Sequence, residues 1–299
     1  MVTRKNRITL IDVVAISLIA GIAAYLAWRT AVVIHYRWNW SVIPQYLFRY
    51  DEAAGGYVPG FLMQGFLITI KLSIWSTLLA IPLGTVMALC SLSGRLFRRL
   101  IARTYVESIR NIPPLVLVFI FYFFFSDQIM TALGIENFIR SRQESTRDAL
   151  SFLFVPTAHC TAFFSAVLTM VLYEGAYMTE IIRAGIQSIE KGQWEASASS
   201  GLGRWQQMRF VILPQATRRV LPPMAGQLIS TIKDSAIVSV VSIQELTFQG
   251  MELMSATYLT FEVWITITAL YFTLTFLCSL GMRRLEVAMH IEGTSYLSV

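Results

Sequence analysis

The sequence predicts an all-α polytopic membrane protein with six transmembrane helices, one added at the N-terminus and five forming a core. Of its 299 residues, 55% are hydrophobic and only 14% are charged, and the mean hydropathy is +0.58. This composition is typical of a protein that crosses a bilayer several times and not of a soluble globular protein. The apolar runs cover residues 8–28, 66–92, 105–125, 155–182, 220–241 and 261–282.

The first apolar run follows a basic segment, residues 1–7, and is followed directly by Arg29. It is too long for a signal peptide and lacks a clean cleavage site, so we interpret it as a signal anchor. The aromatic side chains of residues 29–60 suit the interface between membrane and water.

The second predicted span places Thr69 and Ser73 on one helical face, together with two further hydroxyl side chains. The third span contains Pro113 and Pro114, which are expected to kink it because proline interrupts the helical hydrogen-bond ladder. Residues 126–151 are expected to form a polar outer loop before the fourth span.

The long loop between the fourth and fifth spans, residues 183–219, is predicted to carry structure of its own. Gly192 can open a short helix over residues 193–200, and a second helix begins near residue 204. The residues expected to end helices here are Gly201, Gly203 and, before the fifth span, Pro214.

Six residues of this loop carry a family resemblance: Glu195, Ala196, Ser197, Gly201, Leu213 and Pro214. They resemble the "EAA" loop of binding-protein-dependent ABC importer permeases. The flanking sequences YEGAYMTEIIRAGI and EKGQWEA resemble the branch that transports polar amino acids such as histidine, glutamine, glutamate and arginine. Ser197 stands where a second alanine is usual, and Val211 stands where isoleucine is usual.

The resemblance implies three parts: an N-terminal anchor and periplasmic segment over 1–60, a type I ABC permease domain over 61–286, and a tail over 287–299. In such permeases the loop is a coupling helix that fits a groove on a cytoplasmic ATPase. A merely structural amphipathic loop is the alternative interpretation.

The function implied is a membrane-spanning permease subunit of an ATP-driven importer of a polar amino acid, working by alternating access. A periplasmic or lipid-anchored binding protein would deliver the substrate, and a second permease would complete a homodimer or heterodimer in the membrane lipid. No GxxxxGK[ST] loop is present, so the chain is predicted not to be an enzyme, to hold no cofactor, and to leave ATP and Mg to a partner ATPase. Nothing indicates nucleic-acid binding. A stand-alone secondary transporter or channel is the alternative, distinguished by uptake without any ATPase.

A polar stripe on the fifth span is the predicted substrate pathway. Its members fall on one helix face: Gln227, Ser230, Thr231, Asp234 and Ser235. A carboxylate within a span is unfavourable by at least ~2.5 kcal/mol unless it is paired or hydrated. We expect Asp234 to bind the ammonium group of the substrate. Hydroxyl groups, including those of Thr69 and Ser73, would donate to the carboxylate of the substrate. The other interpretation is that the stripe holds helices together.

Two further pairs lie in the fourth span. Glu180 and Arg183 have the spacing of a salt bridge at its inner end, for which a gating role is the alternative. Tyr173 and Glu174 lie deeper, and Glu174 is a candidate lining group.

The basic residues predict the orientation. With both termini and the loops 93–104 and 183–219 inside, fifteen Lys and Arg residues lie inside and six outside. This assignment is independent of the resemblance, which itself implies the inner membrane of a bacterium. The three cysteines are widely separated in apolar segments, and no His/Cys cluster occurs, so neither disulfides nor a metal site is expected.

Overall fold

The computed structural model describes residues 10–33, 36–52 and 55–288. The chain divides between Val42 and Ile43 into two units. The first unit contains the apolar helix α1, Leu10–Val33, and a 3₁₀ helix, η1, Trp40–Val42. Helix α1 continues beyond the predicted end at residue 28 because neither proline nor glycine follows to stop it.

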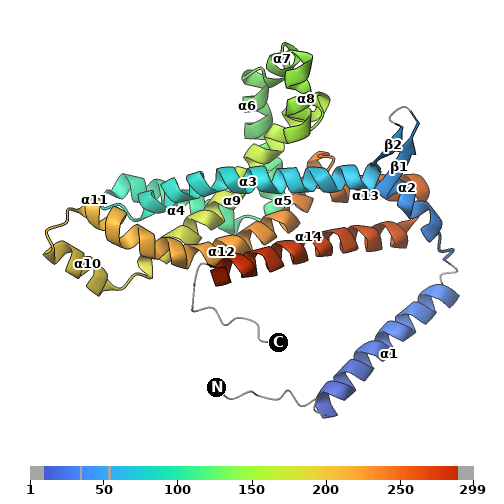
Figure 1. Ribbon diagram of the computed structural model, residues 1–299, viewed down its shortest axis with the longest axis horizontal. Coiled ribbons are helices and arrows are strands. Elements are labelled where there is room, and N and C mark those ends of the chain that lie inside the picture. Colours follow the sequence, from blue (N-terminus) through green and yellow to red (C-terminus); the bar gives the residue numbers. More distant parts are fainter. Residues whose placement is uncertain (1–9, 34–35, 53–54, 289–299) are drawn as a thin grey trace. The chain divides into compact units, whose positions relative to one another are not determined.

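The second unit is almost entirely helical, apart from a small antiparallel hairpin in which Phe48 pairs with Pro59, and it confirms the predicted all-α class (Figure 1). Its elements are α2 Ile43–Leu47, β1 Phe48–Asp51, β2 Gly56–Pro59, α3 Phe61–Ser91, α4 Leu96–Asn111, α5 Pro114–Ile120, the π-helix η2 Phe121–Ser126, α6 Asp127–Ala132, α7 Ile135–Arg140, α8 Glu144–Leu153, the 3₁₀ helix η3 Thr157–His159, α9 Cys160–Gln187, α10 Lys191–Ser199, α11 Arg204–Gln206, the π-helix η4 Gln207–Ile212, α12 Leu213–Asp234, the 3₁₀ helix η5 Ser235–Val241, α13 Leu246–Thr257 and α14 Thr260–Ala288.

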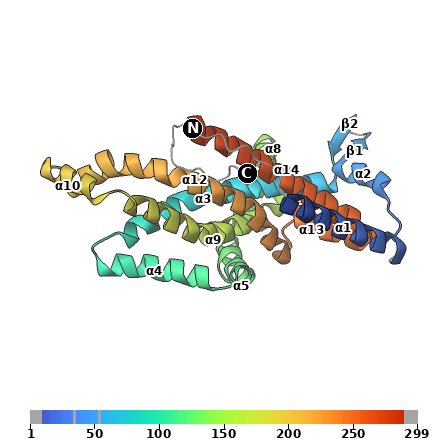
Figure 2. The same cartoon turned by 90° about the horizontal axis from the view of Figure 1, so that it is seen from below.

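Four helical stretches in the described part are long and apolar enough to cross a membrane: Phe61–Ser91, Pro114–Ile139, Thr157–Gln187 and Thr260–Arg284. Helix α12, in the predicted fifth span, packs against α9, α3 and α14 but is more polar than these four, since it carries the stripe. Figures 1 and 2 place α10 at one end of this unit and α13 with the β-hairpin at the other. The loop predicted to be inside and the hairpin segment predicted to be outside are therefore at opposite ends of the bundle, whereas the predicted outer segment 126–151 projects from its middle.

The predicted third span, 105–125, is wrong as a single kinked helix. Helix α4 ends at Asn111, Ile112 is extended with φ −102° and ψ 140°, and a new helix starts at Pro114. A residue before proline avoids the helical region, and a proline in the first turn starts a helix well, so two prolines in succession separate the helices. In Figure 2 α5 is seen nearly end-on while α4 and α9 lie lengthwise, so the chain turns sharply here.

The outer segment, residues 126–151, differs from the predicted loop because most of it is helical. Helices α6, α7 and α8 form a group that projects from the bundle (Figure 1). In this group the guanidinium of Arg142 lies 4.1 Å from the ring centroid of Phe138, a cation–π contact.

The core of the unit is the packing of α3 against α9. A Cβ added at Gly84 of α3 would lie 2.6 Å from the Cβ of Met178 and 3.0 Å from the backbone nitrogen of Thr179 on α9. Only glycine fits where two helix backbones approach so closely. Further along the same helix pair, Phe163 and Met170 of α9 are buried in an apolar cluster with Leu72 of α3. This closely packed pair carries several of the polar residues described below.

Candidate functional site

The loop between α9 and α12 forms an elbow, defined as residues 188–212. Helix α10 begins at Lys191 with Glu190 as its N-cap, so the prediction that Gly192 opens it is wrong by two residues. It ends at Ser199, and Gly201 adopts the left-handed conformation with φ +76°. This confirms the predicted glycine stop, because that conformation strains any residue with a Cβ.

Gly203 has the opposite role from the one predicted. It is the N-cap of the next helix, and its backbone N–H donates to Oε1 of Gln206 over 2.9 Å. The side chain of Gln207 also donates to the carbonyl oxygen of Leu202 over 2.6 Å. These two bonds fix the turn between α10 and α11.

Pro214 does not mark a break, contrary to the prediction. The chain runs helically from α11 through the π-helix η4 into α12, and Pro214 lies in the first turn of α12. Proline has no N–H to donate, and in the first turn of a helix this group would have no partner within the helix. At the change from π to α hydrogen bonding, Pro214 therefore fits without ending the helix. The elbow is therefore joined to α12 by continuous helix.

An apolar cluster fixes the elbow to the ends of α3, α9 and α12. Its buried members are Ala88, Ile182, Ile186, Ile189, Ile212, Ala216 and Val220, and Trp194 and Met208 pack against them. Polar bonds add to it: Gln215 donates to Gln193 over 3.1 Å, and Arg219 donates to the carbonyl oxygen of Ser188. A force on α10 would thus reach both membrane helices.

The predicted docking residues are divided between the two faces of the elbow. Glu195 and Ala196 are exposed, as are Gly201 and Pro214, whereas Leu213 is half-buried. Ser197 is buried and donates to the carbonyl oxygen of Trp194 over 2.8 Å. Two large side chains that the sequence analysis did not assign to docking, Trp205 and Phe210, are 69% and 63% exposed. Such exposed aromatics are typical of a contact surface.

The polar stripe of α12 meets a carboxylate from α9. Nε2 of Gln227 donates to Oε2 of Glu174 over 2.7 Å, and the other oxygen of Glu174 has no hydrogen-bond partner although this side chain is fully buried. Thr231 is buried beside them, and its hydroxyl donates to the carbonyl oxygen of Gln227 over 2.9 Å. Asp234 is half-buried and follows Thr231 by one helical turn on the same face.

The remaining stripe members differ in environment. Ser230 is half-buried, and Ser235 is fully buried and donates to the carbonyl oxygen of Ile232 over 2.8 Å. Lys233 is exposed, and its position about 100° round the helix from Asp234 keeps it off the stripe. The structure thus brings together Gln227, Thr231 and Asp234 and adds Glu174.

Thr69 and Ser73 belong to a second polar cluster. Thr69 donates to Oε2 of Glu245 over 3.3 Å and accepts from the backbone of Leu246, while Ser73 donates to the carbonyl oxygen of Thr69. Glu245 also accepts from Tyr271 over 2.8 Å and caps α13. The sequence analysis missed Glu245 and Tyr271, because their partners are far away in the chain.

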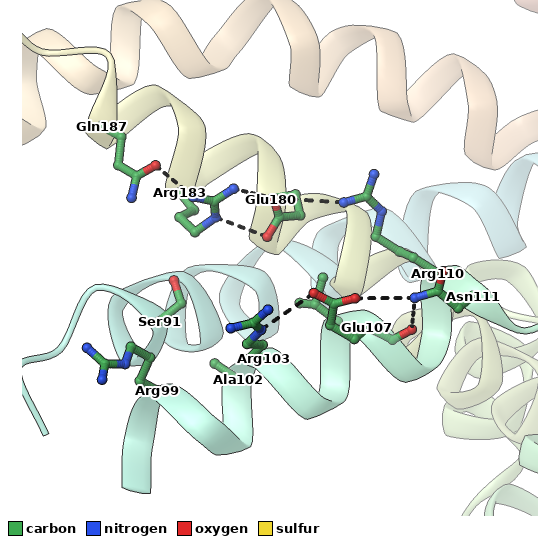
Figure 3. Close-up of a pocket in the computed structure, with 11 residues that line it drawn as sticks. Ser91, Arg99, Ala102, Arg103, Glu107, Arg110, Asn111, Glu180, Arg183 and Gln187 are labelled. Carbon is green, nitrogen blue, oxygen red and sulfur yellow. Dashed lines mark hydrogen bonds and ion pairs between the residues drawn. The ribbon is translucent and has the colours of Figure 1, made fainter. Parts of the chain in front are cut away.

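A cavity of about 500 Å³ lies between α4 and the ends of α3 and α9, at the end of the bundle that carries the elbow (Figure 3). Arg183 makes the predicted bond to Glu180, at 2.6 Å, and Glu180 also faces Arg110 at 3.8 Å. Within α4, Arg103 pairs with Glu107 at 3.6 Å, whereas Arg110 pairs across to α9. No group of His, Cys, Asp and Glu suited to a metal occurs among the described residues.

The family described as "Binding-protein-dependent transport system inner membrane component" matches residues 80–290 of this chain. A glutamine transport system permease protein of Escherichia coli (strain K12) is 33% identical over 225 residues, which cover 74% of this chain and 91% of that protein. A probable glutamine ABC transporter permease protein of Bacillus subtilis (strain 168) is also 33% identical, over 224 residues, which cover 75% and 91%.

Solved structures show the same similarity. An amino acid ABC transporter crystallised with histidines matches with a TM-score of 0.61 and 32% identity, covering 76% of this chain and 94% of that chain. An inward-facing methionine ABC transporter matches with a TM-score of 0.52 and 17% identity, covering 76% and 93%, which shows a shared fold. The resemblance drawn from the loop is confirmed.

Proposed function

The chain belongs to the family of binding-protein-dependent transport system inner membrane components, and we propose that it is the permease subunit of an ATP-driven importer of a polar amino acid. The similarity to ABC importer permeases supports this function and does not support the alternative of a stand-alone transporter or channel. The substrate follows from the relatives, whose names specify glutamine, and from the solved amino acid transporter.

The main structural support for the mechanism is that the elbow has one exposed face and one packed face. Its exposed face presents Glu195, Trp205 and Phe210, whereas its opposite face packs on α9 and α12. We propose that the exposed face docks on a cytoplasmic ATPase that binds the ATP and Mg, while this chain holds no cofactor. Closure of the ATPase would then move α10, and the continuous helix from α11 to α12 would pass that motion to the polar stripe.

The proposed substrate pathway runs past the stripe and Glu174. A polar face in lipid must contact protein or water, and a buried carboxylate with one unpaired oxygen favours a cationic partner. We propose that Asp234 and Glu174 attract the ammonium group of the amino acid, with Gln227, Ser230 and Thr231 as neutral partners and Ser235 at the end of the stripe. Thr69 and Ser73, the other predicted donors, bond instead to Glu245 at the start of α13 and to the backbone of their own helix.

The partners and the orientation belong to the same proposal. A substrate-binding protein outside the cell membrane would deliver the amino acid, and a second permease, identical or related, would complete the pathway. Both termini and the elbow would face the cytoplasm, as the distribution of basic residues predicts.

Uptake by proteoliposomes tests the function. We expect labelled glutamine to accumulate only when the permease, its ATPase, a binding protein and ATP are all present. Uptake by this chain alone, without ATP, would contradict the proposal.

A further inference from the structure

The cavity at the elbow end carries an excess of positive charge that the transport function does not use. Four arginines line it, namely Arg99, Arg103, Arg110 and Arg183, together with only two carboxylates, Glu107 and Glu180. Both Arg110 and Arg183 depend on the single carboxylate of Glu180 (Figure 3). The cavity therefore attracts anions.

The rim of the cavity holds the least compensated arginines. Arg99 makes no ion pair within 4 Å with any residue that the structure describes, and it has no dashed contact in Figure 3. Arg103 is 76% exposed in its side chain and faces Glu107 only at 3.6 Å. A planar guanidinium that is free of carboxylates suits the oxygens of a phosphate group.

The same helix presents an exposed apolar face next to these arginines. Phe97, Leu100 and Ile101 of α4 are 74%, 50% and 44% exposed, whereas Ala102 and Val106 are buried against the bundle. On a helix with 100° per residue, the cavity-lining arginines Arg99, Arg103 and Arg110 lie between the buried face of α4 and this apolar face. An amphipathic helix of this kind lies where lipid headgroups meet acyl chains.

We infer that this cavity binds the phosphodiester headgroup of an anionic phospholipid in the cytoplasmic leaflet, with its acyl chains along Leu100 and Phe97, the part of the apolar face nearest to the arginines. The inference depends on the orientation in the proposed function, which puts the elbow end where anionic lipids attract basic residues. A free phosphate would satisfy the arginines equally well, but it has no use for the apolar face, so we commit to the lipid.

Native mass spectrometry of the purified full chain tests this site. The chain is mixed with equal amounts of phosphatidylglycerol and phosphatidylcholine, and retained lipids are counted. We expect preferential retention of phosphatidylglycerol, and a loss of that preference of about thirtyfold in Arg99→Gln/Arg103→Gln, since each basic residue near a lipid surface contributes ~1 kcal/mol and two are removed. The matched control Arg95→Gln/Arg98→Gln removes two arginines of the same region that do not line the cavity. These act only through screened surface charge, so we expect a loss of at most about threefold.

Equal losses in the two double variants would overturn the inference, because general surface charge would then explain the preference. Retention of both lipids alike would overturn it too. In a separate arm, inorganic phosphate is added to chain in neutral lipid, and binding that phosphatidylglycerol fails to displace would assign the cavity to a soluble anion. None of these outcomes touches ATP-driven uptake, so the lipid site and the transport function can fail separately.

Discussion

Gln227 of α12 donates a hydrogen bond to the buried carboxylate of Glu174 on α9, and 2.7 Å separates the two atoms. The bond joins α9, which precedes the elbow, to α12, into which the elbow continues as helix. A displacement of α12 relative to α9 that separates these two side chains would break it. In the proposed mechanism, motion of the elbow moves α12, so this bond is expected to change when the elbow moves.

Replacing Gln227 by leucine is expected to destabilise the chain, because Glu174 would be left buried without a donor, which costs about 1–3 kcal/mol. Thermal unfolding of the purified chain measures this. The double variant Glu174→Leu/Gln227→Leu should recover much of the loss, since neither polar group then remains. A double variant that is less stable than Gln227→Leu would show that the bond does not account for the effect.

Asp234→Asn is expected to lower ATP-driven amino acid uptake by about tenfold, because the amide lacks the charge that attracts an ammonium group, and a tenfold change is ~1.4 kcal/mol. Assembly with the ATPase should stay intact, as co-purification shows. Glu252→Gln, an exposed acid on α13, is the matched control and should retain wild-type uptake. Unchanged uptake by Asp234→Asn would assign the stripe to helix packing.

Glu195→Lys should abolish co-purification with the ATPase while the protein still inserts into the membrane. The residue is exposed on α10, so the substitution reverses a surface charge without disturbing the core. Glu252→Lys makes the same reversal at the opposite end of the bundle and should leave the complex intact. If both variants still bind the ATPase as wild type does, Glu195 has no part in docking.

Gly84→Ala should destabilise the chain by about 1–3 kcal/mol, because its methyl group would collide with Met178 on the facing helix. The same substitution at Gly192, in α10, meets nothing within 4 Å. There we expect stabilisation by roughly 0.5–1 kcal/mol, since alanine favours a helix. Thermal unfolding of both variants compares the two sites, and a loss at Gly192 equal to that at Gly84 would contradict the packing described.

Local features of the sequence predicted much of this structure. The i, i+3 spacing of Glu180 and Arg183 gave the correct ion pair, and Gly201 gave the correct end of α10. Both depend on residues within one or two helical turns, where spacing alone decides which groups meet.

Features that depend on distant residues or on the direction of helices were not predictable. The bond from Thr69 to Glu245 joins residues 176 positions apart, so no spacing rule finds it. Pro214 was assigned to a break because a proline within a helix usually causes one, but here the preceding π-helix accommodates it. The cavity lies between α4 and the ends of α3 and α9, so predicting it requires knowing how α4 packs on those helices. In the sequence, Pro113 and Pro114 indicate only that the helix is interrupted after α4.

Cross-linking of the elbow to the ATPase tests the central claim most directly. Ala196 on α10 and Ala256 on α13 are both exposed alanines at opposite ends of the bundle, so each is changed to cysteine in a chain that lacks the native cysteines. With a short thiol-to-amine cross-linker, Ala196→Cys should form a product with the ATPase, and ATP hydrolysis should change its yield, whereas Ala256→Cys should form none. An ATPase that cross-links to neither position, or only to Ala256→Cys, would contradict the account.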